Sequence, residues 1–217
     1  MPKKKIILLL LALLEHTILL CQQWQFQKET EGIKVYYRES PDSKIKELKA
    51  TLIVESSLSA AVKVISDAAR FPDWVYKCKA GSVIEGDSEQ SFCYYNLSDF
   101  PWPLSDREFI FRCTTFQNPE TLEVFSLATA APDLLPETSK HVRVQTAESN
   151  FRLRPLEGRQ VEVEYFLKAD PGGLIPAWMV NWALSIGPVQ SLRKFRELVE
   201  APDYNGTNAA LPFIREP

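Results

Sequence analysis

Six strand-like runs follow one another between residues 80 and 169, and no helical pattern interrupts them. The runs cover residues 80–85, 91–97, 108–115, 121–129, 141–153 and 160–169. Two further strands are predicted at 32–39 and 44–55, before a helix that Ser56 or Ser57 can cap. Strands this close in sequence pair antiparallel, and helices must then cover one face of their sheet. The order predicts one α+β domain with a long, curled sheet.

A long final helix is predicted from about residue 176 to residue 200. Between residues 174 and 186 it is apolar nearly all round, which is wider than the stripe that a surface helix needs. This half therefore has two apolar surfaces to cover, with the sheet on one side and a ligand or a membrane on the other. A fully buried core helix is the alternative. Gly187 and Pro188 predict a kink, because proline removes a backbone donor and clashes with the carbonyl of Leu184.

The N-terminal segment, residues 1–21, has the pattern of a secretory signal. Three consecutive lysines precede an apolar run at 6–14, which is too short to span a membrane. A lipidated Cys21 and an uncleaved membrane anchor are the alternatives. We therefore expect an exported protein, periplasmic or membrane-associated, with one domain at 22–200. Residues 201–217 contain three prolines and are expected to form a flexible tail.

Charge and residue types exclude several functional classes. Lys plus Arg is 25 and Asp plus Glu is 28, and without long basic runs this balance argues against nucleic-acid binding. His141 is the one histidine after residue 21, and it opens a predicted strand as a surface residue would. Cys78, Cys93 and Cys113 lie on different predicted strands and lack a fourth ligand for zinc. We therefore expect no metal, no cofactor and no catalytic residues.

One arginine is predicted to point inward. Arg107 shares a strand face with Phe109 and Phe111, and that apolar face should be directed toward the core. An inward guanidinium needs a carboxylate, several carbonyl groups or an anionic ligand, since an unpaired buried charge is very costly. A structural ion pair with Asp106, Glu148 or another acid and a contact with a ligand remain alternatives, and the two are compatible.

Polar residues also interrupt the predicted inward faces of two strands. Asn96 follows Tyr94 on one of them, while Glu148 and Asn150 follow Val144 on the other. A dry core would avoid such residues, whereas an amphipathic tunnel can use them. The pattern therefore favours a binding cavity.

Three segments carry a resemblance to a known family. Residues 100–111 read Phe-Pro-Trp-Pro-Leu-Ser-Asp-Arg-Glu-Phe-Ile-Phe, which resembles a motif of aromatic-Pro-aromatic-Pro-x-Ser-Asn/Asp-Arg-Asp-Tyr/Phe. Residues 165–181 are similar to the last strand, the turn and the entry to the final helix of the same family, and Phe71–Trp74 resembles its tryptophan after the second helix. In this order, over about residues 32–200, the segments resemble START domains (steroidogenic acute regulatory protein-related lipid transfer), and most of all the phosphatidylcholine-transfer branch.

The resemblance implies a helix-grip fold, in which a curved antiparallel sheet wraps around a long C-terminal helix and leaves a hydrophobic, lipid-sized tunnel. It also implies reversible binding and transfer of one lipid, phospholipid or sterol without chemistry, by a monomer in transient contact with membranes. The alternative function is a small-molecule enzyme of the aromatase or cyclase type on the same fold.

The resemblance further implies a set of site residues. The family arginine aligns with Arg107, which in the phosphatidylcholine branch would face the lipid phosphate. Glu108 replaces the commoner Asp, which is a mild change, and Phe100 lacks the hydroxyl of a Tyr. The resemblance therefore supports an apolar ligand more firmly than it supports phosphatidylcholine. The candidate lipid-binding residues are Arg107, Tyr94, Asn96, Phe100, Trp102, Phe109, Glu148, Trp178 and Trp182.

Overall fold

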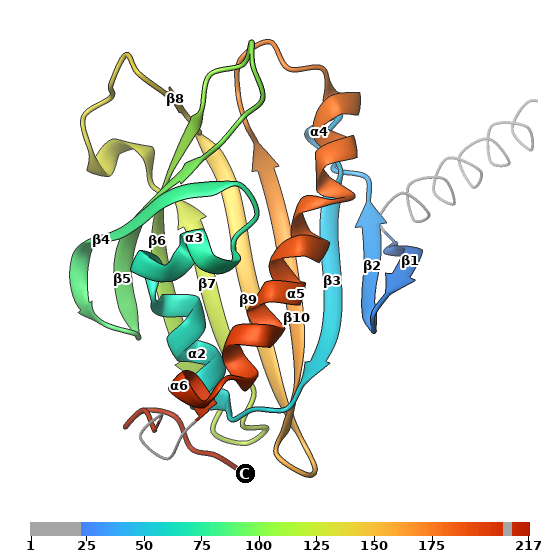
Figure 1. Ribbon diagram of the computed structural model, residues 1–217, viewed down its shortest axis with the longest axis vertical. Coiled ribbons are helices and arrows are strands. Elements are labelled where there is room, and N and C mark those ends of the chain that lie inside the picture. The colour runs from blue at the N-terminus through green and yellow to red at the C-terminus, as the bar shows by residue number, and fades with distance from the viewer. Residues whose placement is uncertain (1–22, 206–209) are drawn as a thin grey trace, which may run out of the picture.

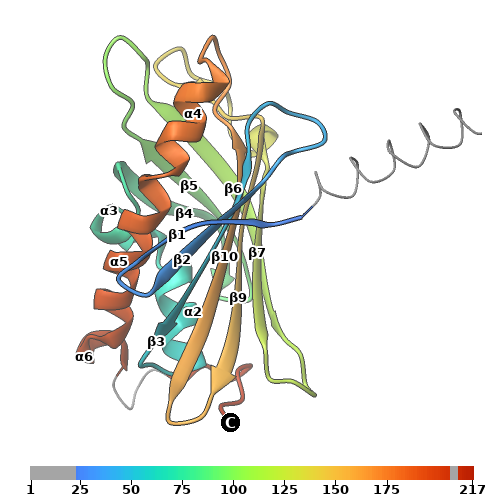
Figure 2. The same ribbon diagram turned by 90° about the vertical axis from the view of Figure 1, so that its right-hand side faces the viewer.

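The computed structural model describes residues 23–205 and 210–217. A ten-stranded sheet curves around a layer of helices on its concave side, as Figures 1 and 2 show. The strands are β1 (Gln25–Thr30), β2 (Ile33–Arg38), β3 (Glu47–Val54), β4 (Cys78–Ser88), β5 (Ser91–Ser98), β6 (Arg107–Gln117), β7 (Val124–Ala130), β8 (Val142–Arg143), β9 (Thr146–Leu156) and β10 (Gln160–Asp170). The helices are α2 (Leu58–Ser66), α3 (Phe71–Trp74), α4 (Ala177–Leu184), α5 (Gly187–Glu200) and α6 (Pro202–Asn205), with short 3₁₀ turns at Ala68–Arg70 and Pro132–Leu134.

The sheet runs in the order β1-β2-β3-β10-β9-β7-β6-β5-β4, and all of these neighbours pair antiparallel. The α+β, helix-grip architecture predicted from the sequence is therefore confirmed. The predicted strand at 141–153 is divided, because β8 pairs parallel with β6 before β9 begins. Strand β1 was not predicted.

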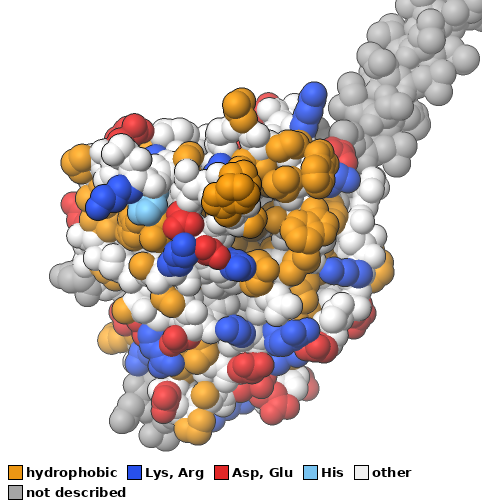
Figure 3. All heavy atoms as spheres, turned by 45° about the horizontal axis from the view of Figure 1, so that its top comes forward, with side chains coloured by type: hydrophobic (Ala, Val, Ile, Leu, Met, Phe, Trp, Pro, Cys, Tyr) orange, Lys and Arg blue, Asp and Glu red, His pale blue; other side chains and the backbone are white. Residues whose placement is uncertain are grey.

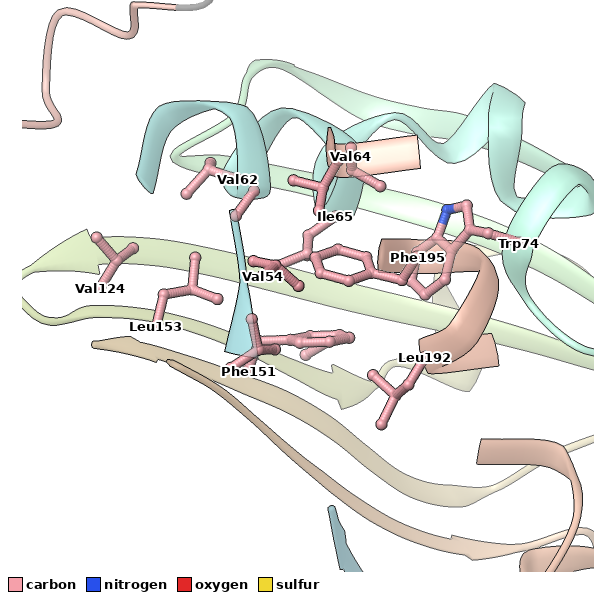
Figure 4. Packing of buried hydrophobic residues seen from close by; sticks show 14 of the residues in the cluster. Val54, Val62, Val64, Ile65, Trp74, Val124, Phe151, Leu153, Leu192 and Phe195 are labelled. Atoms are coloured by element: carbon pink, nitrogen blue, oxygen red, sulfur yellow. The ribbon is translucent and has the colours of Figure 1, made fainter. Parts of the chain in front are cut away.

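The core lies between the concave face of the sheet and helices α2, α3 and α5. Phe195 of α5 is fully buried, and its ring centroid lies 5.5 Å from that of Trp74 and 6.0 Å from that of Phe151 (Figure 4). Leu192 packs one turn away on the same face of α5. At the start of α2, Ser57 is the N-cap, and its hydroxyl accepts the amide of Ala60 at 3.2 Å. These contacts fix the lower half of the helical layer against the sheet.

The final helical region is interrupted near Gly187 and Pro188, where a kink is predicted, but the structure has two separate helices instead of one kinked helix. Helix α4 ends at Leu184 and α5 begins at Gly187. Pro188 lies in the first turn of α5, where its missing N–H breaks no helical hydrogen bond. The alternative prediction, that the first half of this region is a fully buried core helix, is wrong for α4, because the side chains of Trp178 and Trp182 are 69% and 62% exposed.

The expectation of a loose C-terminal tail is wrong for residues 210–217. Leu211 and Ile214 are buried against the domain. The carboxylate of Glu216 accepts the backbone amides of Leu58 at 3.0 Å and Ser59 at 2.9 Å. A carboxylate at this place pairs with backbone amides that have no partner within the helix, and its negative charge interacts favourably with the positive end of the helix dipole. The tail therefore stabilises α2.

The expected secretory signal, residues 1–21, lies outside the described residues. Within residues 23–205 and 210–217, no helix is long and apolar enough to cross a membrane.

Candidate functional site

A pocket of about 480 Å³ separates the upper half of the sheet from the helices. Its sheet side comes from β5, β6, β7, β9 and β10, and its helix side comes from α3, α4 and the start of α5. The lining is mostly apolar, and Phe109, Phe111, Phe151, Leu167 and Met179 are representative. Phe195 of α5, which packs on Phe151 of the sheet, does not line the pocket, whereas five residues of α4 do.

Four charged side chains form a network beside the pocket, and two of them, Lys77 and Asp99, line it. The ammonium group of Lys77 lies 3.0 Å from Asp99, and that of Lys79 lies 2.8 Å from both Asp99 and Asp106. Hydrogen bonds from Lys79 are the main reason that the pKa values of both carboxyl groups lie below their usual range. Asp106 also accepts the amide of Phe100 at 3.2 Å. The network fastens the loop between β5 and β6 to strand β4.

The interior of the pocket contains uncharged polar groups. The Tyr165 hydroxyl lies 3.3 Å from that of Ser149, and burial raises the pKa of Tyr165 to about 12. Burial also raises the pKa of Tyr94 well above its usual value and that of the Cys113 thiol above its own. These groups are therefore neutral near pH 7.

Arg107 points inward, as the strand pattern predicts, and it is buried. Its guanidinium donates to the carbonyl oxygens of Ser105, Pro171 and Gly172, and it lies 4.5 Å from the centre of the Phe100 ring. Within the described part of the chain, no carboxylate lies within 4.0 Å of it. Burial lowers the pKa of Arg107, although Asp106 opposes this effect.

Arg107 therefore holds two loops together at the top of the pocket. The turn after β10 can approach it because Gly172 and Gly173 both adopt positive φ angles, which other residues adopt only with strain. A side chain at Gly173 would also place its Cβ 3.4 Å from the guanidinium. Phe100 and Pro171 line the pocket, whereas Arg107 itself lies behind them.

The structure brings five of the nine predicted site residues together around the pocket. Those that line it are Tyr94, Asn96, Phe100, Phe109 and Trp182. Those that do not line it are Arg107, Trp102, Trp178 and Glu148. Trp102 and Trp178 are exposed instead, at 92% and 69%.

Glu148 lies on the outer face of the sheet, so the predicted inward face of this strand is wrong. Its neighbours Ala147 and Ser149 face inward, and alternate residues of a strand point to opposite sides. The reason is the break between β8 and β9, which shifts the alternation by one residue relative to Val144. Ser149 and Phe151 line the pocket in its place, and the sequence reasoning missed both.

Hydrophobic side chains gather on the surface at the end of the molecule that carries α4 (Figure 3). The large exposed ones there are Trp102 in the β5–β6 loop, Leu174 in the β10–α4 loop, and Trp178 and Trp182 on α4. We call these four residues the apical patch. Isolated exposed apolar residues are ordinary, but a cluster beside a pocket mouth indicates an interaction surface.

Comparisons with known proteins also find START domains and lipid transfer proteins. The family model described as START domain matches residues 12–203. The mouse phosphatidylcholine transfer protein is 27% identical over 171 residues, which are 76% of this chain and 78% of that protein. The crystal structure of a STAR-related lipid transfer protein fragment from Xanthomonas axonopodis superposes with a TM-score of 0.76 and 28% identity, over 82% of this chain and 99% of that one. Human StAR-related lipid transfer protein 5 superposes with a TM-score of 0.70 and 17% identity, over 87% and 93%.

Proposed function

The chain belongs to the START domain family, and on that premise we propose that it binds one lipid molecule in its pocket and carries that lipid between membranes without chemical change. The observation that carries the proposal is the mostly apolar pocket under an interrupted helix. Such a pocket can bury most of an apolar ligand. Two similar proteins are named as lipid transfer proteins, which also supports this function.

The titratable groups of the pocket support transfer rather than catalysis. General acid–base catalysis works best with a group whose pKa lies near the working pH. Tyr94 and Tyr165 are held protonated by burial, and the same is true of the Cys113 thiol. Lys77 and Asp99 are paired with each other. These groups favour the carrier over the aromatase or cyclase alternative.

We also propose that the apical patch contacts the membrane during transfer. Neither Trp102 nor Trp178 lines the pocket, so replacing both with serine leaves the ligand contacts in place. Each tryptophan should contribute about 1–2 kcal/mol when it is partly buried in lipid. The Trp102→Ser, Trp178→Ser variant should therefore bind vesicles at least tenfold more weakly, as measured by vesicle co-sedimentation.

Phe116→Ser is the matched control for this variant. Phe116 is 45% exposed but lies at the other end of β6, about 30 Å from the β5–β6 loop. It should sediment with vesicles as the unaltered protein does. Equal vesicle binding by all three proteins would exclude the apical patch as the contact.

Lipid entry is proposed to require movement of α4. The ammonium group of Lys28 on β1 donates to the carbonyl of Ser185 at 2.7 Å, and thus holds the C-terminal end of α4. Lys28→Met should speed lipid exchange between vesicles by about three- to tenfold, which corresponds to the loss of one typical net hydrogen bond of about 0.6–1.4 kcal/mol. Equilibrium affinity should change much less, because Lys28 does not line the pocket. Lys34→Met, on the exposed face of β2, is the control; an unchanged exchange rate in Lys28→Met would mean that this end of α4 stays in place.

The localisation is also a proposal. The lysines and the apolar run at the N-terminus support export, and N-terminal sequencing of the protein from its host would check it. An intact Met1 or Pro2 on a cytosolic species would contradict export.

A further inference from the structure

Two polar side chains that face the pocket have hydrogen-bonding capacity with no partner. Tyr94 and Asn96 occupy alternate positions of β5, line the pocket, and are only 7% and 8% exposed. Asn96 accepts the Ser98 hydroxyl at 3.1 Å through its carbonyl oxygen. Among residues 23–205 and 210–217, no group bonds to the Tyr94 hydroxyl or accepts from the Asn96 amide nitrogen. Polar groups that lack a protein partner and face an apolar pocket are available to a ligand, because such pockets orient their ligands through a few polar groups.

The surroundings of Tyr94 are polar but uncharged. Its electrostatic neighbours are the Cys113 thiol and the Tyr165 hydroxyl. The Cys113 sulfur lies 3.3 Å from the Ser126 hydroxyl, and the Tyr165 hydroxyl lies 3.3 Å from the Ser149 hydroxyl. These four groups satisfy one another in pairs and leave the donors of Tyr94 and Asn96 for something else. This part of the pocket can therefore hold an oxygen acceptor, and it supplies no positive charge.

The positive charges near the pocket are already engaged. Lys77 lines the pocket and pairs with Asp99. Arg107 lies behind Phe100 and donates to three carbonyl groups. A phosphate placed against Tyr94 would be a buried anion without a cation, which is a costly arrangement.

The size of the pocket points the same way. A volume of about 480 Å³ lies in the lower half of the range of pockets for drug-sized ligands, about 300–1,000 Å³. A phospholipid with two acyl chains has considerably more atoms than such a ligand. A sterol or a lipid with a single chain is the better match in size.

We propose that Tyr94 and Asn96 bind the polar end of the ligand, and that this end is an uncharged oxygen, a hydroxyl or a carbonyl, on an apolar body of sterol or single-chain size. This inference rests on the proposed lipid-carrier function and names its ligand class. The proposed ligand therefore differs from phosphatidylcholine, which the name of the similar mouse protein gives as its cargo.

The test compares ligands that differ by one oxygen. Cholesterol and its 3-deoxy analogue form one pair of probes, and hexadecanol and hexadecane form the other; phosphatidylcholine in vesicles is the fifth probe. The unaltered protein should bind at least one hydroxylated probe about tenfold more tightly than its deoxy analogue, the value of one or two neutral hydrogen bonds. The pair that shows the difference identifies the source as sterol or single chain.

Tyr94→Phe removes only the hydroxyl and should reduce this preference several-fold, and Asn96→Leu should do the same. Tyr95→Phe is the matched control, since Tyr95 is next in sequence but faces Glu108 on the other side of the sheet. The inference is overturned if Tyr94→Phe and Asn96→Leu leave the preference unchanged. It is also overturned if phosphatidylcholine binds more tightly than every hydroxylated probe, although the carrier function then stands. If no probe binds the unaltered protein, the carrier function and the inference fall together.

Discussion

Replacing Ala128 with phenylalanine should abolish lipid binding while the domain still folds. Ala128 is 3% exposed and lines the pocket from β7, where it pairs with Ser149 of β9 and Cys113 of β6. A phenyl ring at this position enters the space that the ligand needs. Affinity should fall at least 100-fold, as measured by transfer of a fluorescent lipid from vesicles to the protein.

The same change should have a modest effect on stability, because the ring enters a cavity. Overpacking of a filled core typically costs about 1–3 kcal/mol, and the cost here should lie at or below the lower end. Thr129→Phe is the matched control, since Thr129 is next on β7 and its exposed side chain points to the opposite face. A folded Ala128→Phe variant that takes up lipid normally would place the binding site elsewhere.

Arg107→Met should lower the free energy of unfolding by about 2–3 kcal/mol, because three buried or partly buried carbonyl groups lose their donor. Methionine keeps much of the apolar stem, so the loss reports the guanidinium rather than packing. Urea denaturation measures the effect. The loops at 99–106 and 171–176 should become more mobile, which faster amide hydrogen exchange in both would reveal.

The sequence-based hypothesis that Arg107 holds an anionic head group stays a prediction, and the same variant tests it. Lipid affinity per folded molecule should change little if the guanidinium serves the loops. A loss of affinity of tenfold or more with unchanged stability would instead support contact with a head group. Arg107→Lys keeps the charge but cannot reach three carbonyls at once, so it should resemble Arg107→Met in stability.

Much of the fold could be predicted because its strands and helices carry clear local patterns. The alternation of Val161 and Val163 with Glu162 and Glu164 defines a strand with one wet face, and both glutamates form ion pairs on that face. Strand β1 gives no such signal, since Gln25–Thr30 is mainly polar. The residue before β1 is held by tertiary contacts: the Arg38 guanidinium and the Lys49 ammonium group lie 4.6 and 5.1 Å from the centre of the Trp24 ring.

The division of β8 from β9 also depends on tertiary contacts. Arg143 is buried with Glu108 and donates to carbonyl groups of the loop at 132–136. The amide of Val144 bonds to the carbonyl of Glu108 at 3.0 Å. No local pattern around residue 144 indicates a break, so Glu148 could not be assigned to the correct face from sequence.

The candidate site was predictable in kind and only partly in detail. The alternation of residues along the strands was enough to predict that Tyr94, Asn96 and Arg107 point inward, and all three are buried. It could not choose among the possible partners of Arg107, because two of its acceptors, Pro171 and Gly172, come from a turn that is distant in sequence. The all-round apolar pattern of α4 was informative, since one side of this helix lines the pocket while Trp178 is exposed.

Native mass spectrometry of the protein purified from its own host would show whether one lipid molecule occupies the pocket. We expect a complex of one chain with one lipid, which is present in the unaltered protein and in Thr129→Phe and absent from Ala128→Phe. Denaturing conditions should release the lipid unchanged in mass, as expected for a non-covalent cargo. An unaltered protein that carries no lipid, and that takes none up after incubation with vesicles, would show that the pocket is not a lipid-binding site.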